Sequence, residues 1–318
     1  MSSFESTGSR GPRVVALGGG HGLSASLAAL RHLTGNLTAV VTVADDGGSS
    51  GRLRRELSVL PPGDLRMALS ALCDDGDWGQ TWRDVLQHRF VSDGPLNGHA
   101  LGNLLIVSLW ELLGDSVEGL DWVGRLLNIK GRVVPMASVP LEIEADVFDD
   151  AGPRTIRGQV SVASAGADIS AVRMDPPDAP ATPEAAWAIG EADWVIFGPG
   201  SWYTSVIPHL LVPGIHDALL GTHAKRMLVI NLVKDSETVH MSPADHVRSF
   251  HQHSPNLGLD VVLVDPDTVR DREDLERAAG ECGARVLYRS VAMRDSRSRH
   301  DPLFLAAAYR DVFNNAES

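Results

Sequence analysis

Two glycine-rich segments, each directly after a short apolar run, are the residues best suited to bind a ligand. The first segment follows the run 14–17 and the second follows the run 40–44. Glycine lets the backbone turn tightly and approach a ligand closely, and the N-terminus of a following helix attracts an anion. We therefore expect a phosphorylated small molecule at these turns. The contacting residues are expected to be Gly18, Gly19, Gly20, His21 and Gly22, followed by Asp45, Asp46, Gly47, Gly48, Ser49, Ser50 and Arg52.

The first segment also fits the pattern Gly-x-Gly-x-x-Ala, which ends at Ala25. Asp45 then stands where a dinucleotide-binding fold keeps the acid that binds ribose, so NAD is one candidate ligand. The second segment contains more polar groups than a ribose contact needs. Asp45 and Asp46 are suited to bind Mg²⁺ together with ligand phosphates. The plain alternative is a polar turn with a solvated pair of aspartates.

A third glycine-bearing segment follows the apolar run 194–197 and contributes Gly198, Gly200 and Ser201. The carboxyl ends of parallel strands converge on one crevice in a doubly wound sheet. Three glycine segments at that edge therefore favour one shared binding site over three unrelated turns.

Two further polar clusters are candidates for the same site. Asn97, His99 and Asn103 lie just before an apolar helical run. His99 and Asn103 are spaced to share a helix face, although residues of these types also serve simply as helix caps. Near the end of the chain, Arg299 is suited to close on a phosphate; the alternative is a solvated charged turn.

The elements that must position these segments alternate between β-branched apolar runs and helical patterns. Residues 64–127 are expected to be a helical insertion, and 132–173, where apolar and polar residues alternate, an antiparallel region. The pattern predicts one α/β domain over 13–318, with a Rossmann-like, doubly wound, mostly parallel sheet, an inserted helical region and a small antiparallel hairpin element. Residues 1–12, rich in serine and glycine, are expected to form a disordered tail.

Composition and charge exclude several classes of protein. The chain has 318 residues, 43% of them apolar, so it can bury a large core. Its formal net charge of −13 argues against binding to nucleic acid or to an anionic membrane. Cys73 and Cys282 are too few for a disulfide framework or a zinc site. The longest apolar run, 101–113, is too short and too polar to span a bilayer.

With these segments in place, the chain resembles the YvcK-like gluconeogenesis factors of the CofD-like superfamily. The matching segments, in order, are 16–23, 41–53, 60–66, 98–103, 197–205, 231–232, 245–247 and 300–302. The resemblance implies a Rossmann-like three-layer fold and a cytoplasmic protein that binds UDP-N-acetylglucosamine. It further implies a role in cell-wall synthesis and cell shape on gluconeogenic carbon sources. It adds Asp64, Arg66 and Asn231 to the expected ligand-binding residues.

The sequence departs from the family pattern at His21, where the family commonly has threonine, and at Met241, where it often has tyrosine. The leading interpretation is a UDP-sugar-binding regulator with no catalytic residues, together with a homo-oligomer and cell-wall regulatory proteins as expected partners. CofD proteins are 2-phospho-L-lactate transferases of coenzyme F420 biosynthesis, so a Mg²⁺-dependent transferase using the Asp45 region is the second hypothesis. An NAD-binding protein is the third, although no residue set for hydride transfer is visible.

Overall fold

The computed structural model describes residues 11–149 and 152–315, so most of the predicted tail, 1–10, lies outside the described residues. Its main sheet has seven strands in the order β10-β9-β8-β7-β1-β2-β3, and every neighbouring pair is parallel. The strands are β1 (Val14–Gly18), β2 (Leu37–Val41), β3 (Arg132–Pro135), β7 (Trp194–Phe197), β8 (Lys225–Val229), β9 (Val261–Val264) and β10 (Arg285–Tyr288).

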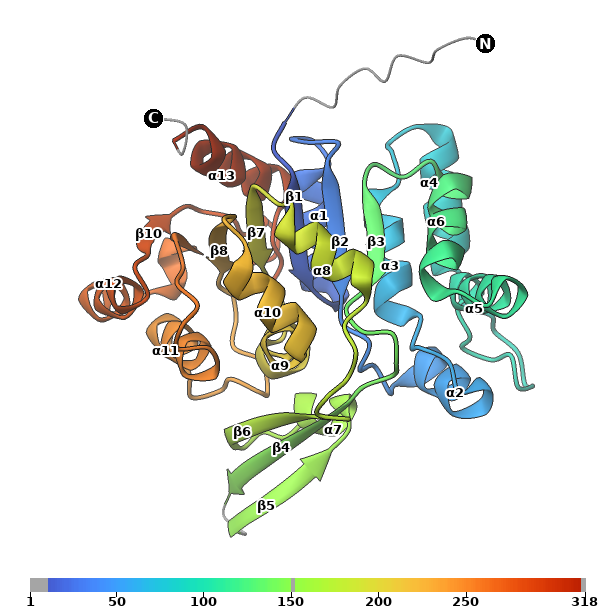
Figure 1. Cartoon of the computed structure of the whole chain (residues 1–318), viewed down its shortest axis with the longest axis horizontal. Coiled ribbons are helices and arrows are strands. Elements are labelled where there is room, and N and C mark those ends of the chain that lie inside the picture. The colour runs from blue at the N-terminus through green and yellow to red at the C-terminus, as the bar shows by residue number, and fades with distance from the viewer. Residues whose placement is uncertain (1–10, 150–151, 316–318) are drawn as a thin grey trace.

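Helices cover both faces of this sheet, which is why its central strands are continuously apolar. Figure 1 shows α8 and α10 in front of the sheet and α1 and α3 behind it. The helices are α1 (Gly20–Leu30), α2 (Gly48–Leu57), α3 (Gly63–Leu72), α4 (Asp77–Gln87), α5 (Leu101–Leu113), α6 (Ser116–Leu127), α7 (Gln159–Ala163), α8 (Pro183–Gly190), α9 (Pro208–Leu211), α10 (Pro213–Gly221), α11 (Pro243–His253), α12 (Arg272–Glu281) and α13 (Pro302–Asn314), with a π-helix η1 (Trp202–Val206) and a 3-10 helix η2 (Pro266–Thr268). The predicted α/β, doubly wound, mostly parallel fold is confirmed.

A second, antiparallel sheet of three strands projects from the body (Figure 1). It consists of β4 (Glu142–Asp149), β5 (Gly152–Arg157) and β6 (Asp168–Asp175). Ile143, Ala145 and Val147 of β4 are buried, while Arg173 pairs with Asp146 on the exposed side. The alternation expected for a sheet with one wet face is therefore present.

Three boundaries differ from the expectations. The region expected to be antiparallel from residue 132 starts with β3, which pairs in parallel with β2, because Val133 and Val134 are both buried rather than alternating. Strand β2 ends at Val41, so 42–44 continue beyond the ladder toward the site. Gly48, Ser49, Ser50 and Arg52, expected in a turn, lie in helix α2.

No helix within 11–149 or 152–315 combines the length and the apolar character needed to cross a membrane. The hydrophobic core forms a buried layer on each face of the main sheet, between the strands and the helices that cover them. In one of these layers, Phe197 of β7 meets Phe250 of α11 edge-on, with ring centroids 5.0 Å apart, and both rings are fully buried.

Replacing Phe250 with alanine tests this layer. We expect Phe250→Ala to lower the free energy of unfolding by about 3–5 kcal/mol, because it removes a buried ring and leaves a cavity. The same change at Phe148, which is 61% exposed on the small sheet, should cost less than about 0.5 kcal/mol. Urea unfolding followed by circular dichroism measures both, and equal losses would contradict the packing described.

Candidate functional site

The first and third glycine segments meet where the strand order of the main sheet reverses. The chain moves from β1 to β2 on one side and later adds β7 on the other side of β1. Such a switch point is where open α/β sheets bind ligands. A Cβ on Gly22 would lie 2.2 Å from the Pro199 carbonyl oxygen, so the two turns touch directly. Gly20, at φ +58°, occupies the left-handed region that favours glycine.

A cleft of about 960 Å³ opens beside these turns. It brings together seven of the predicted residues from widely separated parts of the sequence. They are His21, Gly22, Arg66, Gly200, Ser201, Asn231 and Arg299. The N-terminus of α1, which starts at Gly20, belongs to the same wall, so backbone N–H groups are available to an anion.

The charge of this cleft is opposite in sign to the charge of the whole chain. Its arginines and histidines are Arg31, Arg66, Arg83, Arg89, Arg299, His21, His32 and His300, and among the described residues Asp235 is its one carboxylate. The sequence reasoning missed Arg31, Arg83 and Arg89, because they lie outside any glycine motif. A concentration of arginines in a chain of net charge −13 makes this cleft chemically suited to an anion.

The arginines of the cleft differ in whether their guanidinium groups already have hydrogen-bond or ion-pair partners within the protein. Arg31 pairs with Asp75 at 2.6 Å, and Arg83 donates to the carbonyls of Cys73 and Asp74. Within the part of the chain that the structure describes, the guanidinium of Arg299 has no hydrogen-bond or ion-pair partner, and the residue is exposed. Arg299 is therefore the cation of the cleft most available to a ligand.

Asn231 fixes the third glycine segment. Its Oδ1 accepts from the Gly200 N–H at 2.9 Å, and its Nδ2 donates to the Gly200 carbonyl at 2.7 Å. This pair of hydrogen bonds uses both ends of the amide. Asn231 therefore positions the turn, while Ser201 and the Gly200 backbone line the cleft.

Asp45 and Asp46, predicted as one Mg²⁺ site, face different elements. Asp45 Oδ1 accepts from the Gly47 N–H at 2.9 Å, and its Oδ2 would lie 2.7 Å from a Cβ on Gly63 at the start of α3. Asp46 Oδ1 accepts from the Val160 N–H at 3.0 Å, on α7. The two carboxylates therefore diverge, and within the described ranges no group of three or more His, Cys, Asp or Glu side chains forms a metal cluster.

Asp64 is the carboxylate that Asp45 approaches. It lies buried in the first turn of α3, and its Oδ2 has no hydrogen-bond partner among the described residues. Burial, and then the charge of Asp45, raise the pKa of Asp64 to about 7. An Mg²⁺ ion prefers one or two carboxylates plus ligand phosphates. The unpartnered Oδ2 of Asp64 lies against the Gly19 turn, so Asp45 and Asp64 fit such an ion better than Asp45 and Asp46 do.

Ser49, His99, Asn103 and Arg66 form a buried hydrogen-bonded chain. Ser49 Oγ lies 3.0 Å from His99 Nδ1 and accepts from Asn103 Nδ2 at 3.0 Å. Arg66 Nε then donates to Asn103 Oδ1 at 2.8 Å. Of these four side chains, only Arg66 lines the cleft, so the others support it from behind.

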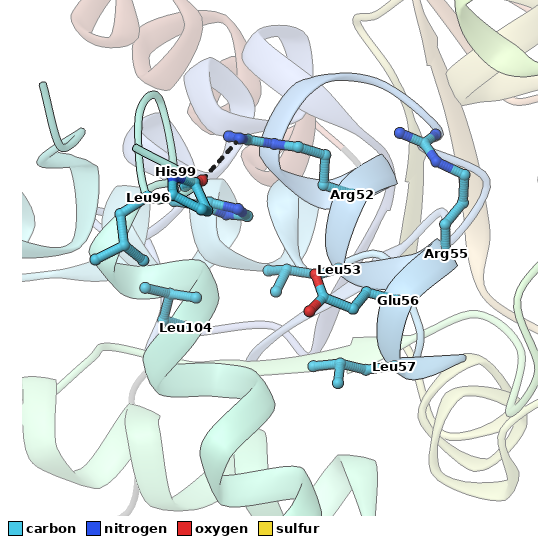
Figure 2. A pocket seen from close by; sticks show the side chains of 9 residues that line it. Arg52, Leu53, Arg55, Glu56, Leu57, Leu96, His99 and Leu104 are labelled. Atoms are coloured by element: carbon cyan, nitrogen blue, oxygen red, sulfur yellow. Dashed lines mark hydrogen bonds between the residues drawn. The ribbon is translucent and has the colours of Figure 1, made fainter. Parts of the chain in front are cut away.

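The remaining predicted residues lie away from the cleft. Gly18 and Gly19 are buried in the β1–α1 turn, Gly198 in the β7 turn, and Ser50 against Gly63. Gly47 is the N-cap of α2, and Gly48 is the first residue of that helix. Arg52 donates to the carbonyls of Pro95 and Asn97. It lines, with His99, a separate groove of about 670 Å³ between α2 and the 95–99 turn (Figure 2).

Glu237 is a buried carboxylate that no sequence motif indicated. It accepts from the backbone N–H groups of Tyr203 at 2.7 Å and Thr204 at 3.2 Å, and so caps the π-helix that follows the third glycine segment. Burial raises the pKa of Glu237 to about 7, and the nearby Asp235 acts in the same direction. The Glu237 N–H donates to Asp235 Oδ1 at 3.2 Å, and Asp235 lines the cleft, so this hydrogen bond connects the cap to the cleft.

The family model described as 2-phospho-L-lactate transferase CofD matches residues 14–292. The gluconeogenesis factor of Bacillus subtilis (strain 168) is 38% identical over 272 residues, which cover 84% of this chain and 84% of that protein. A relative from Mycobacterium tuberculosis (strain H37Rv) carries that name in provisional form and is 52% identical over 94% of this chain and 90% of its own length.

A solved structure is similar over nearly the whole chain. The crystal structure of a Bacillus halodurans protein of the UPF0052 family has a TM-score of 0.84 at 32% identity. The similarity covers 94% of this chain and 98% of that chain. The described fold therefore has a counterpart in a solved structure.

Glu237→Gln tests the buried cap through the pH dependence of stability. In the folded chain Glu237 holds its proton up to a pKa of about 7, whereas an unfolded glutamate loses it near pH 4.3. Between these values the folded state binds more protons, so this group's contribution to stability falls as pH rises. Glutamine stays neutral. We therefore expect the melting temperature of the variant, relative to that of wild type, to increase as pH rises from about 5 to about 8.

Exposed Glu273 on α12 provides the matched control. Glu273→Gln should keep a constant offset from wild type across the same pH range in differential scanning calorimetry. A Glu237→Gln curve that runs parallel to wild type would show that the carboxyl does not hold a proton in the folded state.

Proposed function

The chain belongs to the CofD family and, within it, to the YvcK-like gluconeogenesis factors, and on that premise we propose that it is a cytoplasmic regulatory protein that binds a nucleotide sugar of the UDP-N-acetylglucosamine type. We further propose that it serves cell-wall synthesis and cell shape on gluconeogenic carbon sources. The relatives' name, gluconeogenesis factor, supports the general role. The ligand class rests on the cleft at the switch point of the sheet.

The observation that carries this proposal is the charge and shape of that cleft. A nucleoside diphosphate sugar combines two phosphates with a sugar and a base, and it needs cations, backbone N–H groups and an elongated space. The cleft offers arginines and the N-terminus of α1, in about 960 Å³. Arg299 supplies an uncommitted guanidinium for a phosphate, and arginine matches phosphate oxygens with two parallel hydrogen bonds.

A Mg²⁺-dependent phospholactyl-type transferase is the second candidate, and Asp64 is the observation that favours it. A bound Mg²⁺ ion would neutralise phosphate charge at the turn after β1. Asp45 and Asp64 are the residues that would hold it, because the Asp64 Oδ2 is buried without a partner among the described residues. A nucleotide-sugar regulator can use the same ion, so the metal does not by itself decide between the two functions.

Titration with UDP-N-acetylglucosamine tests the leading proposal. We expect the folded wild-type chain to bind it with measurable heat in isothermal titration calorimetry. Arg299→Ala should weaken binding about 10- to 100-fold, because a charge-assisted hydrogen bond to a phosphate is lost.

Arg297→Ala is the control. That neighbouring side chain is 84% exposed and pairs with Asp267 at 3.3 Å, outside the cleft. Its removal should leave the dissociation constant unchanged. No heat from folded wild-type protein at millimolar ligand, or equal affinity in the Arg299 variant, would contradict the proposal. Displacement of the sugar nucleotide by NAD would point to the dinucleotide alternative.

Mg²⁺ dependence is tested separately by thermal shift with UDP present. We expect Mg²⁺ to raise the melting temperature of wild type, and this increase to vanish in Asp64→Asn, because the amide cannot replace a carboxylate ligand. Asp46→Asn should retain the increase, since Asp46 faces α7. Loss of the increase in Asp46→Asn alone would instead restore Asp45 and Asp46 as the metal pair.

A further inference from the structure

Arg66 reaches the cleft from a buried position that holds its side chain in place. The residue is 4% exposed, and a Cβ on Gly102 would lie 2.8 Å from its Cδ, so its stem packs closely against the start of α5. Its Nε donates to Asn103 Oδ1 at 2.8 Å, and its Nη1 donates to Gln87 Oε1. Among the described residues Nη2 has no hydrogen-bond partner, yet it is not fully enclosed by protein. Because Arg66 lines the cleft, this nitrogen is available to a ligand.

Arg89 brings a second guanidinium group to the same cleft. It lies two residues after the end of α4 at Gln87 and is exposed. Its Nη1 donates to the Gly98 carbonyl at 2.8 Å, and among the described residues neither Arg66 nor Arg89 forms a salt bridge. Burial, and then the positive charge of Arg89, lower the pKa of Arg66 to about 10, so the two guanidinium groups interact unfavourably. An anion bound to both would replace this repulsion with attraction.

Arg66 and Arg89 approach the cleft from a different side than Arg299 does. Helix α1 packs against α3 on one side and against α13 on the other (Figure 1). Arg66 belongs to α3, and Arg89 belongs to the segment after α4, which packs on α3. Arg299 lies in the segment that leads into α13. The cleft therefore has two separate sources of positive charge, one on each side of α1.

We propose that Arg66 and Arg89 form a second anion-binding site of the cleft, which binds a phosphate group. A carboxylate has two oxygens in one plane, and one guanidinium group is enough to pair with both. The oxygens of a phosphate point in tetrahedral directions, so they can accept from guanidinium groups that come from two different elements. Gln87 and Asn103 hold Arg66 in position for this contact. The phosphate can belong to the nucleotide sugar proposed above or to a separate phosphorylated molecule.

Titration of the Arg299→Ala protein with inorganic phosphate isolates the proposed site. The buffer contains EDTA, so that no metal ion bridges phosphate to a carboxylate. We expect phosphate to bind with measurable heat in isothermal titration calorimetry, because Arg66 and Arg89 are unchanged. Adding Arg89→Gln should raise the phosphate dissociation constant about 10- to 100-fold, because a charge-assisted hydrogen bond is lost.

Arg310→Gln in the same background is the matched control. Arg310 is an exposed residue of α13 that does not line the cleft, and its removal should leave the phosphate dissociation constant unchanged. If Arg89→Gln melts early by circular dichroism, Arg89→Lys takes its place, with an expected loss of about 3- to 10-fold, since lysine keeps the charge but not the fork of donors. No heat from phosphate at high millimolar concentration, or equal affinity in the Arg89 and Arg310 variants, overturns the inference.

A second titration, of wild type saturated with UDP-N-acetylglucosamine, identifies the source of the phosphate. If the nucleotide sugar's own phosphate occupies the site, Arg89-dependent binding of inorganic phosphate disappears. If a separate phosphorylated molecule occupies it, this binding persists; both outcomes support the site. A chain that does not bind the nucleotide sugar but binds phosphate through Arg89 contradicts the function proposed above and leaves this inference in place.

Discussion

The contact between the first and third glycine turns is the constraint on which the site depends. Gly22 packs against Pro199 so closely that the space for a side chain is already filled by backbone. This contact is available because β1 and β7 are hydrogen-bonded neighbours although most of the chain separates them in sequence. Asn231 then fixes the turn after β7 through two hydrogen bonds to Gly200. Every wall of the cleft is placed relative to these two turns.

Around that contact, the protein separates its charges. Cations line the cleft, whereas the carboxylates Asp64 and Glu237 are withdrawn into the protein behind it. Burial raises the pKa of each to about 7, so neither imposes a full negative charge on the cleft at neutral pH. An acidic chain can in this way present a basic surface to a small anion without a general attraction for polyanions.

Much of this was predictable from sequence, because glycine turns after buried runs have a strong physical signature. The fold class and the convergence of the β1 and β7 turns followed from such runs. The structure of the second glycine-rich segment, after β2, was harder to predict, because Gly48–Leu57 contains glycines that disfavour a helix and yet forms α2. Glycine and serine at a helix start are compatible with both a loop and a cap. The direction in which Asp46 points depends on α7, more than a hundred residues away, and Arg31, Arg83 and Arg89 reach the cleft only through helix packing.

The cleft also joins the two ends of the chain. Gly22 comes from the first turn after β1, and Arg299 and His300 come from the segment just before the last helix. During synthesis, the first half of the site therefore exists long before the second half has left the ribosome. A nascent chain that has folded its first strands still lacks Arg299, which lines the cleft. A chain cut short before residue 299 would keep the strands of the main sheet but lose that arginine.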